Sequence, residues 1–478
     1  MRKLTLIFIC LFALSAPALA RQNAAQFQLS ACPFAIPSGT AIDCGMLTVP
    51  ENHNTPDGKQ IQLAVARIYS SSGTPQADPL IYLAGGPGEG ALSSADAWVN
   101  SPIRQKRDII LLDQRGTGYS QPALNCPPMT TFDDVEACRA QWVSAGVNLS
   151  DYNSAQSAAD IADLRVALGY REWNLFGVSY GTRLALTAMR DHADGIRSVI
   201  LDSVYPPQVN DWEEFASDEA NAFSTLFKAC AADAVCNEAY PDLENAFYRT
   251  VAQLNDQPIL YNPTTGGNAV ALDGNTLAET LYQALYLTAN IPYLPKVIYG
   301  VSQGDYPLLS QLETGEIFYK SPLRQGAGAE RGAAGMYNSV TCSEEIPFTN
   351  EDKALADAQA ARPELRDRLT AAVQSVFATC AIWSVTPVSR IEALPVTSDL
   401  PALVLAGAFD PATPVAWGRS AAKTLSKSFF FEFPSVAHGV IDSGECASRI
   451  ILAFLDNPTL PPASGCLNSL RELQFVTH

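Results

Sequence analysis

The segment GVSYG at residues 177–181 places a serine, Ser179, between two glycines. A GxSxG segment at a strand-to-helix turn is typical of a nucleophilic serine, because the tight turn projects the hydroxyl above the sheet at a helix N-terminus. Isolated matches also arise by chance, and Ser179 would then be only a small residue in a tight turn. The apolar run 174–178 before the serine and the helical pattern after it favour the nucleophile.

A serine hydroxyl needs a base that removes its proton. The chain has four histidines. His53 lies in a polar loop before most strands, His192 ends the helix that follows Ser179, and His478 is the last residue. We therefore predict that His438, in FPSVAHGV after the apolar run SFFFEF, is the general base.

The third member of such a site is a carboxylate that lies between the serine and the histidine along the chain. Asp410 follows the apolar run PALVLAG and precedes His438 by 28 positions, which leaves room for one helix and one strand. Alone, Asp410 would more often be a loop or helix-capping aspartate. The order Ser179, Asp410, His438 after three predicted strands favours a triad, in which Asp410 orients the imidazole and stabilises its charged form.

An acyl-transfer site also needs donors for the oxyanion. The glycine-rich segment LAGGPGEG at 83–90 follows an early apolar run, and we predict that the backbone N–H groups of Gly86 and Tyr180 are these donors. A phosphate-binding loop is the other interpretation of clustered glycines, but the chain has neither GxxxxGK[ST] nor a complete GxGxxG. We predict no organic cofactor.

Several segments are apolar at consecutive positions, as strands buried on both faces of a parallel sheet are. They are 79–84, 108–113, 174–178, 198–202 and 401–407. Helical patterns lie between them, such as 157–169, where we expect Ser157 to be the N-cap. The alternating segment 61–70 predicts an antiparallel edge strand. The alternation of strands and helices predicts an α/β fold with a mostly parallel, doubly wound sheet.

The strand pattern fades after residue 210 and resumes near residue 401. The intervening sequence has charged and apolar residues at helical spacing. A chain of 478 residues is long enough for one large domain with an insertion. We predict an α/β core formed by 21–210 and 385–478, split by a mainly helical insertion, 211–384.

The first residues have the pattern of a secretory signal peptide, 1–20. Arg2 and Lys3 precede an apolar run, and Ala18-Leu19-Ala20 offers small residues for cleavage after Ala20. The run is too short for a membrane anchor, and no later segment is apolar enough to span a bilayer. We expect a secreted or periplasmic protein without stable membrane insertion.

Ten cysteines lie after this segment, an even number that suits disulfides in an oxidising compartment. Sequential pairing is the simplest scheme, although sequence does not fix connectivity. The pairs would be Cys32 with Cys44, Cys126 with Cys138, Cys230 with Cys236, Cys342 with Cys380, and Cys446 with Cys466. A zinc site would need close CxxC pairs with histidines, and the chain has none, so we predict no metal.

The chain as a whole is strongly acidic. Without Arg2 and Lys3 it has 29 basic and 49 acidic residues, a net charge of −20 with neutral histidines. Such a charge repels phosphate backbones, so we expect no nucleic-acid partner. Oligomeric state is not predicted.

Five segments together resemble the secreted prolyl aminopeptidase and tripeptidyl aminopeptidase branch of the α/β-hydrolase family. They are GGPG, DQRGTGYS, GVSYGTRLAL, GAFDPATP and AHG, in this order over essentially the whole mature chain. The resemblance implies an α/β-hydrolase fold, hydrolysis of peptides from the N-terminus through an acyl-enzyme, and a helical cap over the site. This chain departs from its relatives at Ala84, where they usually have histidine, and at Glu89, where they have small residues; both departures bear on substrate range.

An exopeptidase of this kind must bind the free ammonium group of its substrate. SVTCSEEIPF places Glu344 and Glu345 beside Cys342, and we hypothesise that one of them receives the amine. A solvated acidic pair is an equally good interpretation of these two residues.

We therefore predict a secreted serine hydrolase that acts as an aminopeptidase of prolyl or tripeptidyl type on peptides with a free N-terminus. A carboxylesterase acting on small esters is the first alternative, because acyl transfer uses the same groups and a fold does not specify a substrate. A catalytically inactive α/β-hydrolase domain used for binding is the second alternative.

Overall fold

The computed structural model describes residues 25–262, 269–314, 332–470 and 473–477. The predicted signal peptide, 1–20, lies outside the described residues. Within the described part of the chain, no helix has the length and apolar character needed to cross a bilayer.

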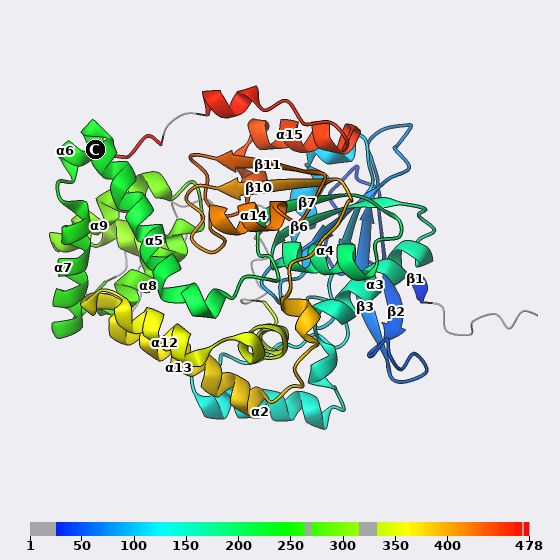
Figure 1. Ribbon diagram of the computed structural model, residues 1–478, viewed down its shortest axis with the longest axis horizontal. Coiled ribbons are helices and arrows are strands. Elements are labelled where there is room, and N and C mark those ends of the chain that lie inside the picture. Colours follow the sequence, from blue (N-terminus) through cyan, green and yellow to red (C-terminus); the bar gives the residue numbers. More distant parts are fainter. Residues whose placement is uncertain (1–24, 263–268, 315–331, 471–472, 478) are drawn as a thin grey trace, which may run out of the picture.

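A nine-stranded sheet forms the centre of the protein, in the order β1-β2-β3-β5-β4-β6-β7-β10-β11 (Figure 1). Strands β5, β4, β6, β7, β10 and β11 are parallel, which confirms the predicted mostly parallel sheet. The strands are β1 (Gln26–Ser30), β2 (Ile42–Pro50), β3 (Gln60–Ile68), β4 (Leu80–Leu83), β5 (Ile109–Leu112), β6 (Trp173–Ser179), β7 (Ile196–Val204), β10 (Ala402–Gly407) and β11 (Ser428–Phe433).

The prediction of an edge strand at 61–70 was wrong in one respect. This segment forms β3, which is antiparallel as expected, but it lies between β2 and β5. Strands β1 and β2 extend the sheet beyond it, so the edge is β1. An alternating pattern indicates that one face of a strand is buried and the other is less buried. It does not indicate whether a further strand pairs with that strand.

Helices cover both faces of the sheet. Ile200 of β7 faces one apolar cluster with α1 and α15, and the adjacent Leu201 faces another with α3, α4 and α14. These helices are α1 (Ala95–Val99), α3 (Ser154–Ala167), α4 (Tyr180–Asp191), α14 (Val415–Ala422) and α15 (Glu445–Asp456). Helix α3 begins earlier than predicted: Asn153 is its N-cap and accepts from the N–H of Gln156, so Ser157 lies inside the helix.

Between β7 and β10 the chain is mainly helical, and Figure 1 shows this segment beside and beneath the sheet. It has its own apolar core, which includes Phe223, Phe247 and Leu281. A short antiparallel pair, β8 (Ile259–Tyr261) and β9 (Val270–Leu272), was not predicted. The helices are α5 (Asp211–Ala232), α6 (Ala234–Ala239), α7 (Leu243–Asp256), α8 (Gly274–Leu285), α9 (Leu294–Ser302), α10 (Pro307–Thr314), α11 (Ala334–Val340), α12 (Glu351–Ala360) and α13 (Pro363–Trp383).

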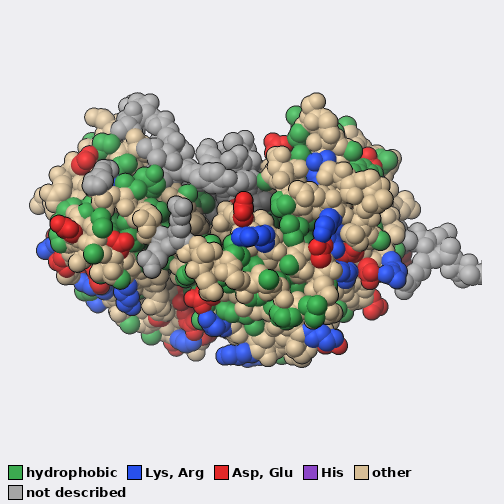
Figure 2. All heavy atoms as spheres, turned by 90° about the horizontal axis from the view of Figure 1, so that it is seen from above, with side chains coloured by type: hydrophobic (Ala, Val, Ile, Leu, Met, Phe, Trp, Pro, Cys, Tyr) green, Lys and Arg blue, Asp and Glu red, His purple; other side chains and the backbone are tan. Residues whose placement is uncertain are grey.

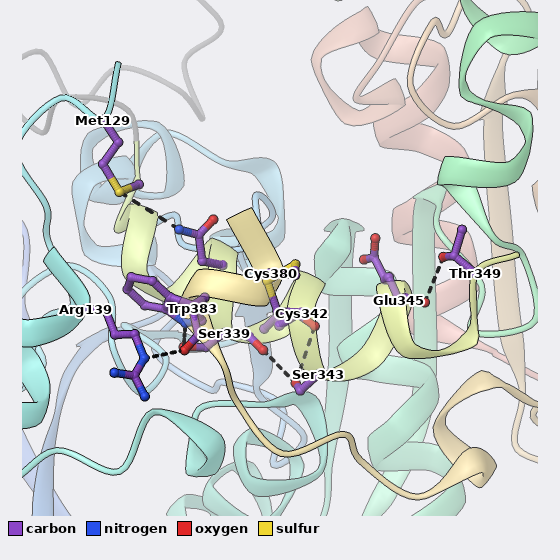
Figure 3. Close-up of a disulfide and its surroundings, with 11 residues drawn as sticks. Met129, Arg139, Ser339, Cys342, Ser343, Glu345, Thr349, Cys380 and Trp383 are labelled. Atoms are coloured by element: carbon purple, nitrogen blue, oxygen red, sulfur yellow. Dashed lines mark hydrogen bonds between the residues drawn. A yellow bond between two sulfur atoms is a disulfide. The ribbon is translucent and has the colours of Figure 1, made fainter. Parts of the chain in front are cut away.

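Five disulfides join cysteines that are neighbours in sequence order. They are Cys32–Cys44, Cys126–Cys138, Cys230–Cys236, Cys342–Cys380 and Cys446–Cys466. The bond between Cys342 and Cys380 ties a π-helical turn, Thr341–Glu345, to α13 (Figure 3). That turn carries both glutamates of the proposed amine site. In the described residues there is no group of histidine, cysteine and acidic side chains that could hold a metal ion.

Candidate active site

Ser179 lies at the turn between β6 and α4, with a backbone φ of 58° and ψ of −128°. A non-glycine residue with positive φ is strained and persists only where the surroundings enforce it. A side chain on Gly177 would come within 2.2 Å of the carbonyl oxygen of Gly181, and one on Gly181 within 2.0 Å of that of Leu83. The two glycines therefore allow the close packing that holds Ser179 in this conformation, and its side chain remains partly exposed.

Asp410 and His438 form a buried pair. The Nδ1 atom of His438 lies 2.9 Å from each carboxylate oxygen of Asp410. The side chain of His438 is 1% exposed and that of Asp410 is 0% exposed. Thr413 also donates to Asp410, through its N–H at 2.9 Å and its hydroxyl at 2.7 Å. Burial acts to raise the pKa of Asp410, but attraction to His438 and these hydrogen bonds outweigh it and lower the pKa. The carboxylate is therefore ionised at neutral pH and can orient the imidazole.

The other ring nitrogen of His438, Nε2, is buried and forms no hydrogen bond with any described residue, Ser179 included. Strand β7 connects the two residues: Val204 pairs with Ser179 in the sheet, and the hydroxyl of the preceding Ser203 accepts from the N–H of Gly439, which follows His438. Catalytic hydrogen bonds are often long before substrate binds, so the missing bond to Ser179 does not exclude the pair.

The glycine-rich loop after β4 lies against the serine. A side chain on Gly85 would come within 3.0 Å of the Cβ of Ser179, and Gly86 is exposed although its neighbours are buried. Tyr180 is the first residue of α4, where backbone N–H groups have no intrahelical acceptor. Tyr180 directly follows the predicted nucleophile, and Gly86 follows Gly85, which lies against it.

Sequence reasoning missed Asp113, a fully buried carboxylate after β5. It accepts hydrogen bonds from the N–H of Leu92 at 2.8 Å and from that of Tyr119 at 2.7 Å. These two residues follow the glycine-rich loop and the DQRGTG segment, so Asp113 holds the two loops together. Its place as the last residue of the predicted strand 108–113 was the only available signal.

The structure separates the two predicted amine-binding residues. Glu344 is 1% exposed, and its carboxylate accepts from the N–H of Ser154 at 2.5 Å, from its hydroxyl at 2.8 Å and from Nε of Arg183 at 3.2 Å. The hydroxyl of Ser154 also lies 2.9 Å from that of Tyr180. Glu344 therefore connects the insertion to α3 and α4, and its oxygens are occupied.

Glu345 has a different environment. Its backbone carbonyl accepts from the hydroxyl of Thr349 at 2.9 Å (Figure 3). The residue lines a cavity of about 210 Å³ together with residues such as Asn210 and Phe348. Burial raises the pKa of Glu345, with attraction to Arg183 opposing this shift. A cationic partner would stabilise the ionised carboxylate.

The helical insertion contacts the histidine directly. The ring of Tyr286, which follows α8, lies edge-on to that of His438 at 5.3 Å between centroids. The hydroxyl of Thr288 accepts from the N–H of Ala437 at 2.9 Å. The insertion thus forms one wall around His438.

The buried carboxyls predict how stability depends on pH. Burial raises the pKa of Asp113 to about 6 and those of Asp202 and Glu219 to about 7. A carboxyl with a raised folded-state pKa contributes stability that is present below its unfolded pKa and is lost as pH rises through the folded pKa. Asp410 and Asp456, whose pKa values are lowered, already contribute fully above about pH 5.

We therefore expect the melting temperature, with disulfides intact, to be higher at pH 5.5 than at pH 8.5 by about 5 °C. Glu219→Gln, which removes one of these groups away from the candidate site, is expected to flatten the dependence. A melting temperature that rises from pH 5.5 to pH 8.5 would contradict the raised pKa values of these carboxyls.

Comparison with known proteins relates most of the chain to one family. The family model described as alpha/beta hydrolase fold matches residues 78–445. Among curated proteins, Serine protease Hip1 of Mycobacterium tuberculosis is 25% identical over 470 residues, covering 90% of this chain and 88% of the relative. Carboxylesterase B of Mycobacterium tuberculosis is 25% identical over 455 residues, covering 88% and 85%. Tripeptidyl aminopeptidase of Streptomyces coelicolor is 30% identical over 247 residues, covering 45% and 44%.

Proposed function

Because the chain belongs to the α/β-hydrolase family, we propose that it is a secreted serine peptidase that releases proline or a short peptide from the N-terminus of its substrates. The observation that carries the proposal is the buried Asp410–His438 pair, whose unpartnered Nε2 lies on the same sheet end as the strained Ser179. The relatives named as a serine protease and a tripeptidyl aminopeptidase support peptide substrates.

In the proposed reaction, Nε2 of His438 takes the proton of Ser179 as its Oγ attacks the scissile carbonyl carbon. The N–H groups of Gly86 and Tyr180 stabilise the oxyanion. The imidazolium, held by Asp410, then gives its proton to the leaving amine, and the C–N bond breaks. Water repeats the sequence on the acyl-enzyme, releasing the acid and restoring the serine hydroxyl. These steps need no metal or organic cofactor.

Within the amine hypothesis, the contacts favour Glu345 over Glu344. Both residues line the cavity, but the carboxylate of Glu344 accepts three hydrogen bonds from Ser154 and Arg183, which tie it to the core. Glu345 bonds instead to the side chains of Tyr205 and Trp212. A buried carboxylate with a raised pKa gains most from a cation that enters with the ligand, because the cation offsets the cost of burying the charge. We propose that Glu345 receives the substrate ammonium group and that Glu344 maintains the insertion's contact with the core.

Glu345→Gln is expected to lower kcat/KM for free-amine peptides by about 100-fold, because removing one partner of a buried charge pair costs roughly 2–5 kcal/mol. Hydrolysis of a short acyl ester, which has no amine, should change less than about threefold. Glu344→Gln is the matched comparison: it should lower the melting temperature and reduce both activities together. Equal losses of activity on the peptide and on the ester in Glu345→Gln would contradict the assignment of Glu345 as the amine-binding residue.

A carboxylesterase is the second candidate, because the relative named Carboxylesterase B covers 88% of this chain. The test of the proposed function is digestion of a mixed peptide library, with and without N-terminal acetylation, read by mass spectrometry. Cleavage only of free-amine peptides supports the exopeptidase. Cleavage that ignores acetylation, or rapid turnover of a short acyl ester with no peptide cleavage, would overturn it.

The insertion and the first residues of the chain have proposed roles as well. We propose that 211–384 is a cap that limits access and that the chain is exported after cleavage at Ala20. A peptide with a free N-terminus is the proposed partner. On the face that Figure 2 shows, Lys and Arg are scattered among Asp and Glu.

A further inference from the structure

A β-bulge in β7 lies opposite the proposed nucleophile. Val178 of β6 pairs with Asp202, but the next residue, Ser179, pairs with Val204, so Ser203 is an additional residue in β7. Ser203 has a backbone φ of 56°. Bulges redirect side chains and are frequent beside active sites. This one lets two consecutive residues of one strand, Asp202 and Ser203, reach the same loop.

That loop is the one that carries His438. The N–H of Gly439 donates to the hydroxyl of Ser203, and the N–H groups of Val440 and Ile441 donate to the two carboxylate oxygens of Asp202, each at 2.8 Å. The hydroxyl of Ser203 donates in turn to Asp202 at 3.3 Å. Three consecutive backbone amides after the histidine are thus held by two side chains of one strand.

Asp202 is fully buried, at 0% exposure, and no cation forms an ion pair with it among the described residues. A buried carboxylate of this kind is costly unless its hydrogen bonds are satisfied. Two amides and the charge of His438 favour its ionised form, whereas burial and Asp442 of the same loop oppose it. The carboxylate accepts from two backbone amides that an apolar side chain would leave unsatisfied, so it fixes the position of the loop that carries them.

We propose that Asp202 and Ser203 are positioning residues that fix the loop of His438 relative to Ser179 and keep Nε2 aligned for proton transfer. The inference rests on the proposed function, since it assumes that His438 is the base. It is distinct from the role of Asp410, which contacts the imidazole itself. The bulge links the two parts, because Asp202 and Ser203, which hold the loop of His438, directly precede Val204, which pairs with Ser179.

Asp202→Asn tests the inference, because an amide can accept from only one of the two N–H groups and presents its own donor to the other. We expect kcat to fall about 100-fold, as for a catalytic group displaced by about 1 Å, with KM changed less than about threefold. Ser203→Ala, which removes one bond, should lower kcat about tenfold. The rate of labelling by a fluorophosphonate should fall in parallel.

A pH profile separates positioning from mere stability. Asp202 must be ionised to accept both bonds, and burial raises its pKa to about 7, so activity should be present above this pH and lost below it. Protonation of Asp202 would steepen the acid limb of log kcat/KM, and Asp202→Asn should reduce the slope of that limb by about one. The profile must be measured where circular dichroism shows a folded protein.

Asp160→Asn is the matched control. Asp160 is also fully buried, it pairs with Arg115 and His53, and the structure records no contact between it and the loop of His438. The Asp160→Asn variant should be less stable than the native protein. Its kcat should be near normal, and the slope of the acid limb should be unchanged. The inference would be overturned if Asp202→Asn kept the native kcat and the native slope of the acid limb. If Asp202→Asn does not fold, an unchanged kcat in Ser203→Ala would overturn it. Full activity of Ser179→Ala would instead overturn the proposed function.

Discussion

Ser179→Ala is expected to lower kcat by about 10⁴–10⁶-fold on peptide and ester substrates alike. The variant retains the oxyanion donors and the substrate contacts but has no atom that can form the acyl-enzyme. KM should change little, since the loss falls on the chemical step. Steady-state kinetics with a fluorogenic free-amine peptide measures both constants.

The matched control for this variant is Ser426→Ala, an exposed serine between α14 and β11. It should retain full activity, and both variants should melt within about 3 °C of the native protein, because neither leaves a buried group unsatisfied. A merely several-fold loss in Ser179→Ala would refute the role of the serine.

Asp410→Asn is expected to lower kcat by about 10⁴-fold. The amide would leave the volume unchanged but would lack the charge that attracts an imidazolium, and its NH₂ group would favour the wrong tautomer of His438. Because Thr413 donates to the same carboxylate through its N–H and its hydroxyl, the amide would also lose one of these bonds. Single-turnover kinetics on a short acyl ester would place the loss in acylation.

Asp399→Asn is the control for Asp410→Asn, since Asp399 lies just before the same strand, β10, and its side chain is 85% exposed. Its activity should equal that of the native protein. An Asp410→Asn variant that stays folded and retains more than about a tenth of native kcat would show that another group orients the histidine.

The local sequence was sufficient to predict the residues that lie at strand ends. Ser179, Asp410 and His438 each follow an apolar run, and the carboxyl ends of neighbouring parallel strands meet at one edge of a sheet. The mostly parallel sheet followed from consecutive apolar positions for the same reason. These inferences need only the chain order and the strand pattern.

The residues that sequence reasoning missed depend on contacts between distant segments. Asp113 and Asp202 each end a predicted strand, but only the fold brings the loops they hold beside them. The bulge at Ser203 depends on the register of two strands, which one strand's sequence does not encode. Glu344 and Glu345 are adjacent and of one type, so their different environments follow from the π-helical turn and from Ser154 and Arg183.

The most direct test of whether Ser179, Asp410 and His438 act together is covalent labelling with a fluorophosphonate, followed by peptide mapping by mass spectrometry. The phosphorus should bond to Oγ of Ser179 with loss of fluoride, giving one modified peptide. His438→Ala should slow labelling by at least about 100-fold, because the base that takes the proton is lost. Modification of a different residue, or equal labelling rates in the native protein and in folded His438→Ala, would contradict the proposed triad.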